Sequence, residues 1–291
     1  MRVRQPKFDF SQSRAVWAPV REFAHAQNGG SVGIPALERF LNRVMAKARK
    51  EITGDDAEAV ALRSDITTFI RQESCHYAIH DEMNEVLVRD GYDKIPEIQK
   101  EIEAHYSRLL ETKSLPFLVA YCEGFETLGP ASAMAWCGDS LDHYLAGADR
   151  NIEMMFRWHL LEEFEHRHVC FETFKRLHGG YFLRIYGFLY QLMCFRKYSG
   201  MVTSYMLEKD RASMTPEEVK ASKQRQKEVS RLLMKNIVRN LVKVFSPNYR
   251  PQNLPIPKIW DKIESEIDTA WTPPKGARAA HSTPSTAAAP A

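Results

Sequence analysis

Residues 157–168 read RWHLLEEFEHRH and bring three histidines and three glutamates together within twelve positions. The flanking sequence has helical periodicity, so angular spacing decides which of these side chains can act together. At about 3.6 residues per turn, His159, Glu163 and His166 (i, i+4, i+7) share one face of a helix. Imidazole and carboxylate groups are ligands for iron, manganese and zinc, so this face predicts one part of a metal site.

Length and composition limit the class of protein. The chain has 291 residues, 44% apolar and 26% charged, which is typical of a globular protein with room for a sizeable core. A formal net charge of +3 is too small to indicate binding to nucleic acid. Five scattered cysteines favour a reducing compartment over a disulfide framework. The N-terminal MRVRQPK is not followed by an apolar run, so we expect a cytoplasmic protein without a secretory signal.

Helical periodicity runs through most of the chain, and no segment shows the alternation typical of a strand. Residues 1–33 are interrupted by prolines and glycines and are expected to form an irregular lead-in or short helical pieces. The fold class is predicted to be all-α, a four-helix bundle within a metal-binding domain of residues 34–260. The expected helices span about 35–54, 55–91, 96–113, 115–140 and 149–177. The glycines and proline within 115–140 are expected to kink that helix or to split it in two.

Additional C-terminal helices are predicted beyond the bundle. Residues 181–207 are rich in aromatic residues, leucine and methionine, but their internal charges argue against a transmembrane span. We expect this helix to pack on the bundle or to cover its mouth. Thr215 and Glu218 resemble a capping box that opens a strongly charged helix. Residues 261–291 form a C-terminal extension, which is predicted to be disordered from about 272 because Pro, Ala, Ser and Thr dominate it.

Four of these helices offer candidate metal ligands. Two contribute a Glu-x-x-His pair, and the other two contribute single glutamates. This is the arrangement of carboxylate-bridged dinuclear sites in four-helix bundles. Anionic carboxylates offset the repulsion between two divalent ions, and imidazoles complete the coordination. The candidates are Glu38; Glu73 and His76, with His80 one turn further; Glu123, with Glu126 as its rival; and Glu163 and His166, with His159 one turn earlier.

For each candidate residue, a structural role is a simpler explanation that must be weighed against metal binding. A single Glu-x-x-His on a helix is usually exposed, but two such pairs among apolar neighbours are costly to bury without a cationic partner. Single glutamates are common on helices, so Glu38 and Glu123 are the weaker candidates. His80 is better explained as a core residue or as a group that contacts a ligand. A solvated or hydrogen-bonded face is the expectation for Glu165, His168 and Glu172.

Three stretches of the sequence resemble a known family. PALERF at 35–40, FIRQESCHYAIH at 69–80 and WHLLEEFEHRHV at 158–169 are similar to the bacterial family of predicted metal-dependent hydrolases. The resemblance covers most of residues 8–260. The chain departs from the family pattern in three places: Leu37 replaces a usual glycine, Gly124 replaces a frequent histidine and Glu172 replaces a favoured aspartate. These departures leave the identity of the ligand on the third helix open.

The ligand pattern is also similar to that of ferritin-like di-iron N-oxygenases, which oxidise aryl amines. This similarity implies a ferritin-like bundle holding two iron ions, with manganese or zinc as alternatives. It implies an O₂-activating oxygenase acting on a small organic substrate, with an electron donor as partner; a homodimer is left open. The alternatives are a hydrolase that uses a metal-activated water, and a non-catalytic helical protein that handles iron or binds partners. The ligands implied are Glu38, Glu73, His76, Glu123, His159, Glu163 and His166.

Overall fold

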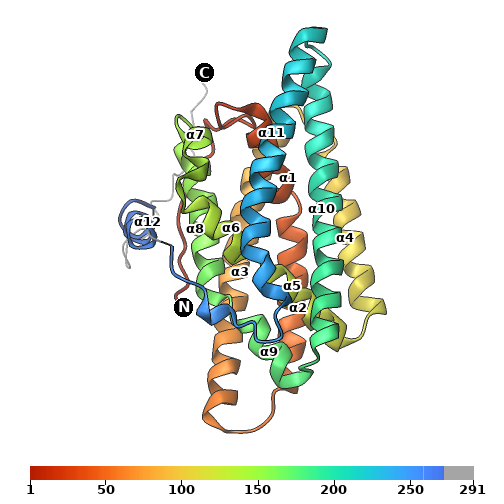
Figure 1. Ribbon diagram of the computed structural model, residues 1–291, viewed down its shortest axis with the longest axis vertical. Helices are drawn as coiled ribbons and strands as arrows, with labels where there is room; N and C mark the ends of the chain where they lie inside the picture. The colour runs from red at the N-terminus through yellow and green to blue at the C-terminus, as the bar shows by residue number, and fades with distance from the viewer. Residues whose placement is uncertain (258, 272–291) are drawn as a thin grey trace, which may run out of the picture.

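The computed structural model describes residues 1–257 and 259–271 of the chain. Within these residues the chain is helical and contains no strand, so the predicted all-α class is confirmed. The long helices run side by side as a bundle (Figure 1). None of the described helices is long and apolar enough to cross a membrane. The disorder predicted from 272 onward lies outside the described residues.

The helices follow one another with short connections. Several begin as the sequence predicts: the Asp56 carboxylate accepts from the Ala59 amide, and Thr215 and Glu218 form the predicted capping box. The α-helices are α1 (Arg21–Ser31), α2 (Ile34–Glu51), α3 (Ala57–Arg89), α4 (Ile95–Thr112), α5 (Leu115–Glu126), α6 (Leu128–Trp136), α7 (Asp142–Leu145), α8 (Arg150–His166), α9 (Val169–Leu177), α10 (Tyr181–Arg211), α11 (Pro216–Leu241) and α12 (Trp260–Glu266). Short 3₁₀ turns η1 (Asp139–Leu141), η2 (Val242–Phe245) and η3 (Pro251–Asn253) and a final π-helical turn η4 (Ile267–Trp271) complete the order.

Two of the predicted long helices are broken. The predicted 115–140 helix divides at Thr127 into α5 and α6, as its glycines and proline suggested. The predicted 149–177 helix was expected to be continuous, and this was wrong: α8 ends at His166 and α9 begins at Val169. The guanidinium of Arg167 donates to the Phe164 carbonyl at this break and satisfies an acceptor that a continuous helix would have paired with a backbone amide.

Helix α10 lies close to α5 along the side of the bundle, because two glycines leave room for it. A Cβ on Gly124 would lie 2.6 Å from Cα of Phe188, and one on Gly187 would lie 2.6 Å from the backbone of Ala120. At Gly124 the absence of a side chain therefore serves helix packing. The prediction that residues 181–207 pack on the bundle is therefore confirmed.

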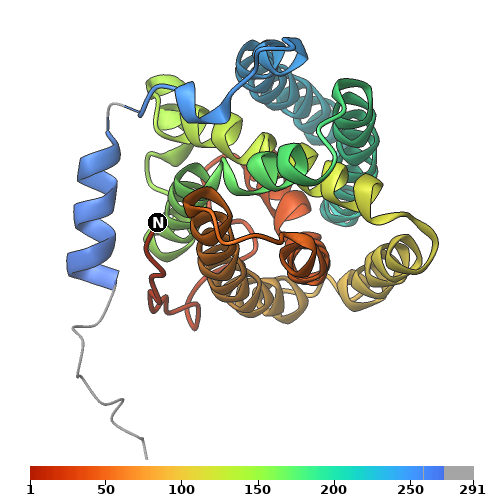
Figure 2. The same cartoon turned by 90° about the horizontal axis from the view of Figure 1, so that it is seen from below.

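The N-terminal residues lie against the bundle. Helix α1 packs along α10, and the segment before it runs beside α8 toward α12. Seen along the bundle, α12 stands outside the main group of helices (Figure 2). The N-terminal segment and the C-terminal α12 therefore meet on the same side of the molecule.

Candidate metal centre

Two groups of buried histidines and glutamates meet inside the bundle. Within each group, one ligand atom from every residue lies within 4.8 Å of the others. Helices α2, α3, α5 and α8 supply these side chains. The first group is Glu38, His76, His159 and Glu163, and the second is Glu73, Glu126, Glu163 and His166.

Glu163 belongs to both groups, and its two oxygens face different ways. Its Oε1 lies 3.0 Å from Nε2 of His159, while its Oε2 lies 3.5 Å from Nε2 of His166. Nε2 of His159 is also 3.3 Å from Glu38 Oε1. A carboxylate placed in this way is suited to bridge two cations, one in each group.

Several potential metal-binding atoms in these two groups lack hydrogen-bond partners within the described residues and are therefore available to metal ions. Both carboxylate oxygens of Glu38, Glu73 and Glu126 are buried and accept no hydrogen bond from the described part of the chain. Nδ1 of His76 and Nε2 of His166 are likewise without a hydrogen-bond partner among the described residues. Buried, unsatisfied carboxylates are strongly destabilising, and divalent cations would relieve this cost. The residues present therefore fit a two-metal site.

Electrostatics within the cluster are dominated by burial and by the mutual repulsion of the carboxylates. Burial, reinforced by the charges of neighbouring glutamates, raises the pKa of Glu38 and of Glu126 well above the ordinary range. Burial acts in the same direction on Glu163, but the positive charges of His166 and His159 outweigh it and hold the pKa of that carboxyl low. Without metal, the cluster is therefore balanced by protons on some of its acids and imidazoles.

Comparison with known families adds to this geometry. The chain matches the model of a family described as predicted metal-dependent hydrolases over residues 2–254. The chain belongs to that family. Its family indicates a metal-dependent enzyme, and the two buried groups could hold the metal. Comparisons with curated proteins and with solved structures find no match.

In this member of the metal-dependent hydrolase family, further residues hold the imidazoles in place. Nε2 of His76 lies 3.2 Å from Glu162 Oε2, and the other oxygen of Glu162 accepts from the backbone and guanidinium of Arg4. Nδ1 of His166 lies 3.2 Å from Oε1 of Gln72. Each contact occupies the ring nitrogen that faces away from the cluster, which fixes the tautomer and leaves the other nitrogen for a metal.

His80 contacts the cluster without entering it. Its Nε2 lies 2.6 Å from Nδ1 of His159, and its Nδ1 lies 2.8 Å from the hydroxyl of Ser31. Ser31 in turn donates to Oδ1 of Asn84. If His159 binds a metal through Nε2, its Nδ1–H donates to His80. Each donor in the hydrogen-bond network of His159, His80, Ser31 and Asn84 then has an acceptor. The sequence left His80 between a core residue and a group contacting a ligand, and the structure places it against a candidate ligand.

Glu123 lies outside both groups. Its buried carboxylate is 3.5 Å from the guanidinium of Arg184 on α10 and accepts from the hydroxyl of Thr127. Burial raises the pKa of Glu123 to about 7, with Arg184 acting against that rise. The structure brings its rival Glu126 into the cluster instead, with Oε2 3.1 Å from Nε2 of His166. We therefore propose Glu126, in place of the predicted Glu123, as the ligand from this helix.

Variants of these two glutamates separate their roles. We expect Glu126→Gln to lower the metal content to about one ion per chain, because an amide is a much poorer ligand than a carboxylate. Glu123→Gln should leave the metal content unchanged, since its partner is an arginine. Metal analysis of both purified variants checks this. Full metal in Glu126→Gln with a loss in Glu123→Gln would restore the assignment made from the sequence.

Gly129 at the start of α6 allows that helix to pass close to Glu163. A Cβ at Gly129 would lie 2.3 Å from Oε2 and 2.9 Å from Cβ of Glu163. We therefore expect Gly129→Ala to displace the Glu163 carboxylate and to weaken metal binding by at least about 10-fold, the scale of effects seen when a ligand loses its support. Gly200→Ala is the matched control, because nothing lies within 4 Å of its added Cβ. Metal titration of the two variants measures the difference, and equal affinities would contradict the close approach.

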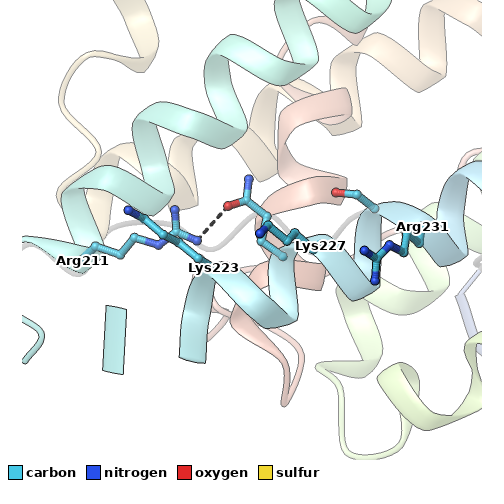
Figure 3. Close-up of a pocket in the computed structure, with 6 residues that line it drawn as sticks. Arg211, Lys223, Lys227 and Arg231 are labelled. Atoms are coloured by element: carbon cyan, nitrogen blue, oxygen red, sulfur yellow. Dashed lines mark hydrogen bonds between the residues drawn. The ribbon is translucent and has the colours of Figure 1, made fainter. Parts of the chain in front are cut away.

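A cavity of about 330 Å³ reaches the cluster from the side of α10 and α11. His159 and Glu163 line its inner end together with His80, and most of the remaining wall is apolar. A larger hollow lies on the surface of α10 and α11 and is lined by Arg211, Lys223, Lys227 and Arg231 (Figure 3). None of the cluster residues lines that basic hollow, whereas His159 and Glu163 line the apolar cavity.

Proposed function

We propose that this protein is an oxidoreductase with a carboxylate-bridged di-iron centre, which activates O₂ to oxidise a small organic molecule. The observation that carries the proposal is the pair of adjacent buried groups that share Glu163. Single carboxylates from α2 and α5 and Glu-x-x-His pairs from α3 and α8 match the pattern of dinuclear carboxylate proteins built in four-helix bundles. The proposed ligands are Glu38, Glu73, His76, Glu126, His159, Glu163 and His166.

The surroundings of the centre favour redox chemistry over hydrolysis. The cluster residues are nearly inaccessible to solvent, with His159 the most exposed at 5%. The cavity that reaches them is walled mainly by aromatic and aliphatic side chains. Such walls suit O₂ and an apolar substrate and exclude water from reactive intermediates, whereas hydrolysis needs a water and a polar scissile group. Mixed nitrogen and carboxylate ligation also suits iron.

Each part of the site has a defined task in this proposal. Two bound iron ions would supply the electrons that reduce O₂, and an external reductant would restore them. Glu163 would contribute to holding both ions, while the contacts of Glu162 and Gln72 keep His76 and His166 in orientation. His80 fixes the tautomer of His159. The apolar cavity orients the substrate at the side of the centre formed by His159 and Glu163.

Hydrolysis is the second candidate, and the family description favours it. The same ligands could hold two zinc or manganese ions, which lower the pKa of a bound water. One of the carboxylates near that water would then accept its proton. The substrate would need a polar group near His159 and Glu163.

One experiment separates these functions. Protein purified from iron-supplemented cells would be analysed for metal, reduced without oxygen, and then mixed with O₂ in a stopped-flow spectrometer. The oxygenase predicts two irons per chain and a transient visible absorption band. Two zinc or manganese ions with turnover of ester or phosphoester substrates would contradict the oxygenase and support the hydrolase. A folded protein that binds no stoichiometric metal would exclude both.

Metal binding should depend on pH and release protons. Although burial disfavours its charged form, the nearby carboxylates of Glu162 and Glu73 raise the pKa of His76 to about 9, and the pKa values of Glu38 and Glu126 are also raised. At neutral pH these groups therefore hold protons in the metal-free protein, and a metal must displace them. Affinity should rise between about pH 6 and 8. Calorimetry in buffers of different ionisation enthalpy measures the released protons, and an affinity independent of pH would contradict the assignment.

A further inference from the structure

The cavity beside the cluster narrows the class of substrate, and this inference rests on the proposed function of the centre. We propose that the substrate is an amphiphile whose apolar body fills the cavity and whose anionic head group, a carboxylate or a similar anion, is held by Arg196 at the mouth. Arg196 would then be a specificity-determining residue that sets which end of the substrate faces the metals.

The volume and walls of the cavity define the apolar body. An apolar protein cavity of about 150 Å³ accommodates benzene. The 330 Å³ found here therefore suits roughly twice as many non-hydrogen atoms, about twelve. The wall between the metal-facing end and the mouth consists mainly of apolar side chains, among them Leu128, Trp136, Phe156, Leu192 and Phe195.

The mouth lies between α10 and α11. Met234 and Val238 line the cavity there and remain 42% and 48% exposed, so an apolar molecule meets apolar side chains before it enters. Arg196 lines the same mouth from α10 and is exposed. Its guanidinium makes a weak contact with Met234, donating to the sulfur over 3.9 Å.

The charge of Arg196 has no partner within the described chain. No carboxylate there forms an ion pair with it, whereas the next residue, Lys197, lies 3.9 Å from Glu101. A substrate with an anionic head would pair with Arg196 at the mouth. A cationic head would be repelled at the mouth.

Binding of a matched series of ten-carbon ligands to the metal-loaded protein tests the inference. Decanoate has the size estimated above, and decan-1-ol and decylamine differ from it in the head group. Isothermal titration calorimetry should show decanoate binding more tightly than decanol, with decylamine weakest. Arg196→Gln should weaken decanoate about 10-fold and leave decanol unchanged, while the control Lys197→Gln should change neither.

Other outcomes overturn the inference. If Arg196→Gln leaves decanoate affinity unchanged, the carboxylate binds elsewhere, for example at the metals. An equal loss for decanol would mean that Arg196 acts only through packing. Ser132 lines the cavity, so Ser132→Phe should abolish decanoate binding, and unchanged binding would place the ligand outside the cavity. Metal content is measured for every variant. Charge-dependent decanoate binding in a protein without metal would support the inference while contradicting the di-iron proposal.

Discussion

Replacing Glu163 by glutamine is expected to remove both metal ions and to abolish activity. Glu163 is the one residue shared by the two groups, with Oε1 directed to His159 and Oε2 to His166. An amide keeps the size of the side chain but lacks the charge, so each ion loses a bridging anion at once. We expect affinity for divalent ions to fall by about 100-fold or more, above the range produced by losing a supporting contact.

The matched control is Glu172→Gln on the neighbouring helix α9. Glu172 is partly exposed and accepts from Gln252, so its loss should not alter the metal content. Metal analysis after dialysis, with far-ultraviolet circular dichroism to show that both variants fold, makes the comparison. Two ions retained by Glu163→Gln would mean that no bridging acid exists at this position.

Replacing Arg4 by methionine is expected to lower the free energy of unfolding by about 3 kcal/mol, the lower end of the range for breaking a buried ion pair. The Arg4 guanidinium is 2% exposed and contacts Glu162, which is fully buried, as well as Glu165 and Glu264. Its removal leaves the buried Glu162 without its arginine and with His76 as its remaining side-chain partner. Because Glu162 contacts Nε2 of His76, metal affinity should also fall by about 10-fold.

Arg2→Met serves as the control for that variant. The Arg2 side chain is 56% exposed and pairs with Asp268 on the surface, and such pairs contribute at most about 1 kcal/mol. Denaturant unfolding of the metal-free proteins measures stability, and metal titration measures affinity. If Arg4→Met loses stability but keeps full affinity, the N-terminal segment supports the fold without positioning His76.

Helical periodicity was enough to predict the fold class and most of the cluster. The i, i+4, i+7 spacing of His159, Glu163 and His166 placed them on one face, and the structure brings all three together. The Glu-x-x-His pair of α3 joins them for the same reason, because one turn of helix fixes which side chains point alike. The spacing of residues within one helix therefore predicts which of its side chains share a face.

Contacts between distant segments could not be predicted in this way. Glu123 and Glu126 lie less than one turn apart, and what separates them is Arg184, which reaches Glu123 from another helix. The contact of Arg4 with Glu162 could not be predicted from the sequence, because the two residues lie far apart in it. The spacing of Glu162 could have indicated a role near the cluster, because it lies three residues after His159 and four before His166. At the break between α8 and α9, Arg167 donates to the Phe164 carbonyl, a contact that periodicity does not predict.

Anomalous X-ray scattering from crystals of the iron-loaded protein tests the central claim most directly. Data collected on both sides of the iron edge should show two peaks about 3.5–4 Å apart, the spacing of two-metal sites. One peak should lie among Glu38, His76, His159 and Glu163, and the other among Glu73, Glu126, Glu163 and His166. No peak among these side chains, or a single peak not bound by Glu163, would contradict a carboxylate-bridged pair of metals.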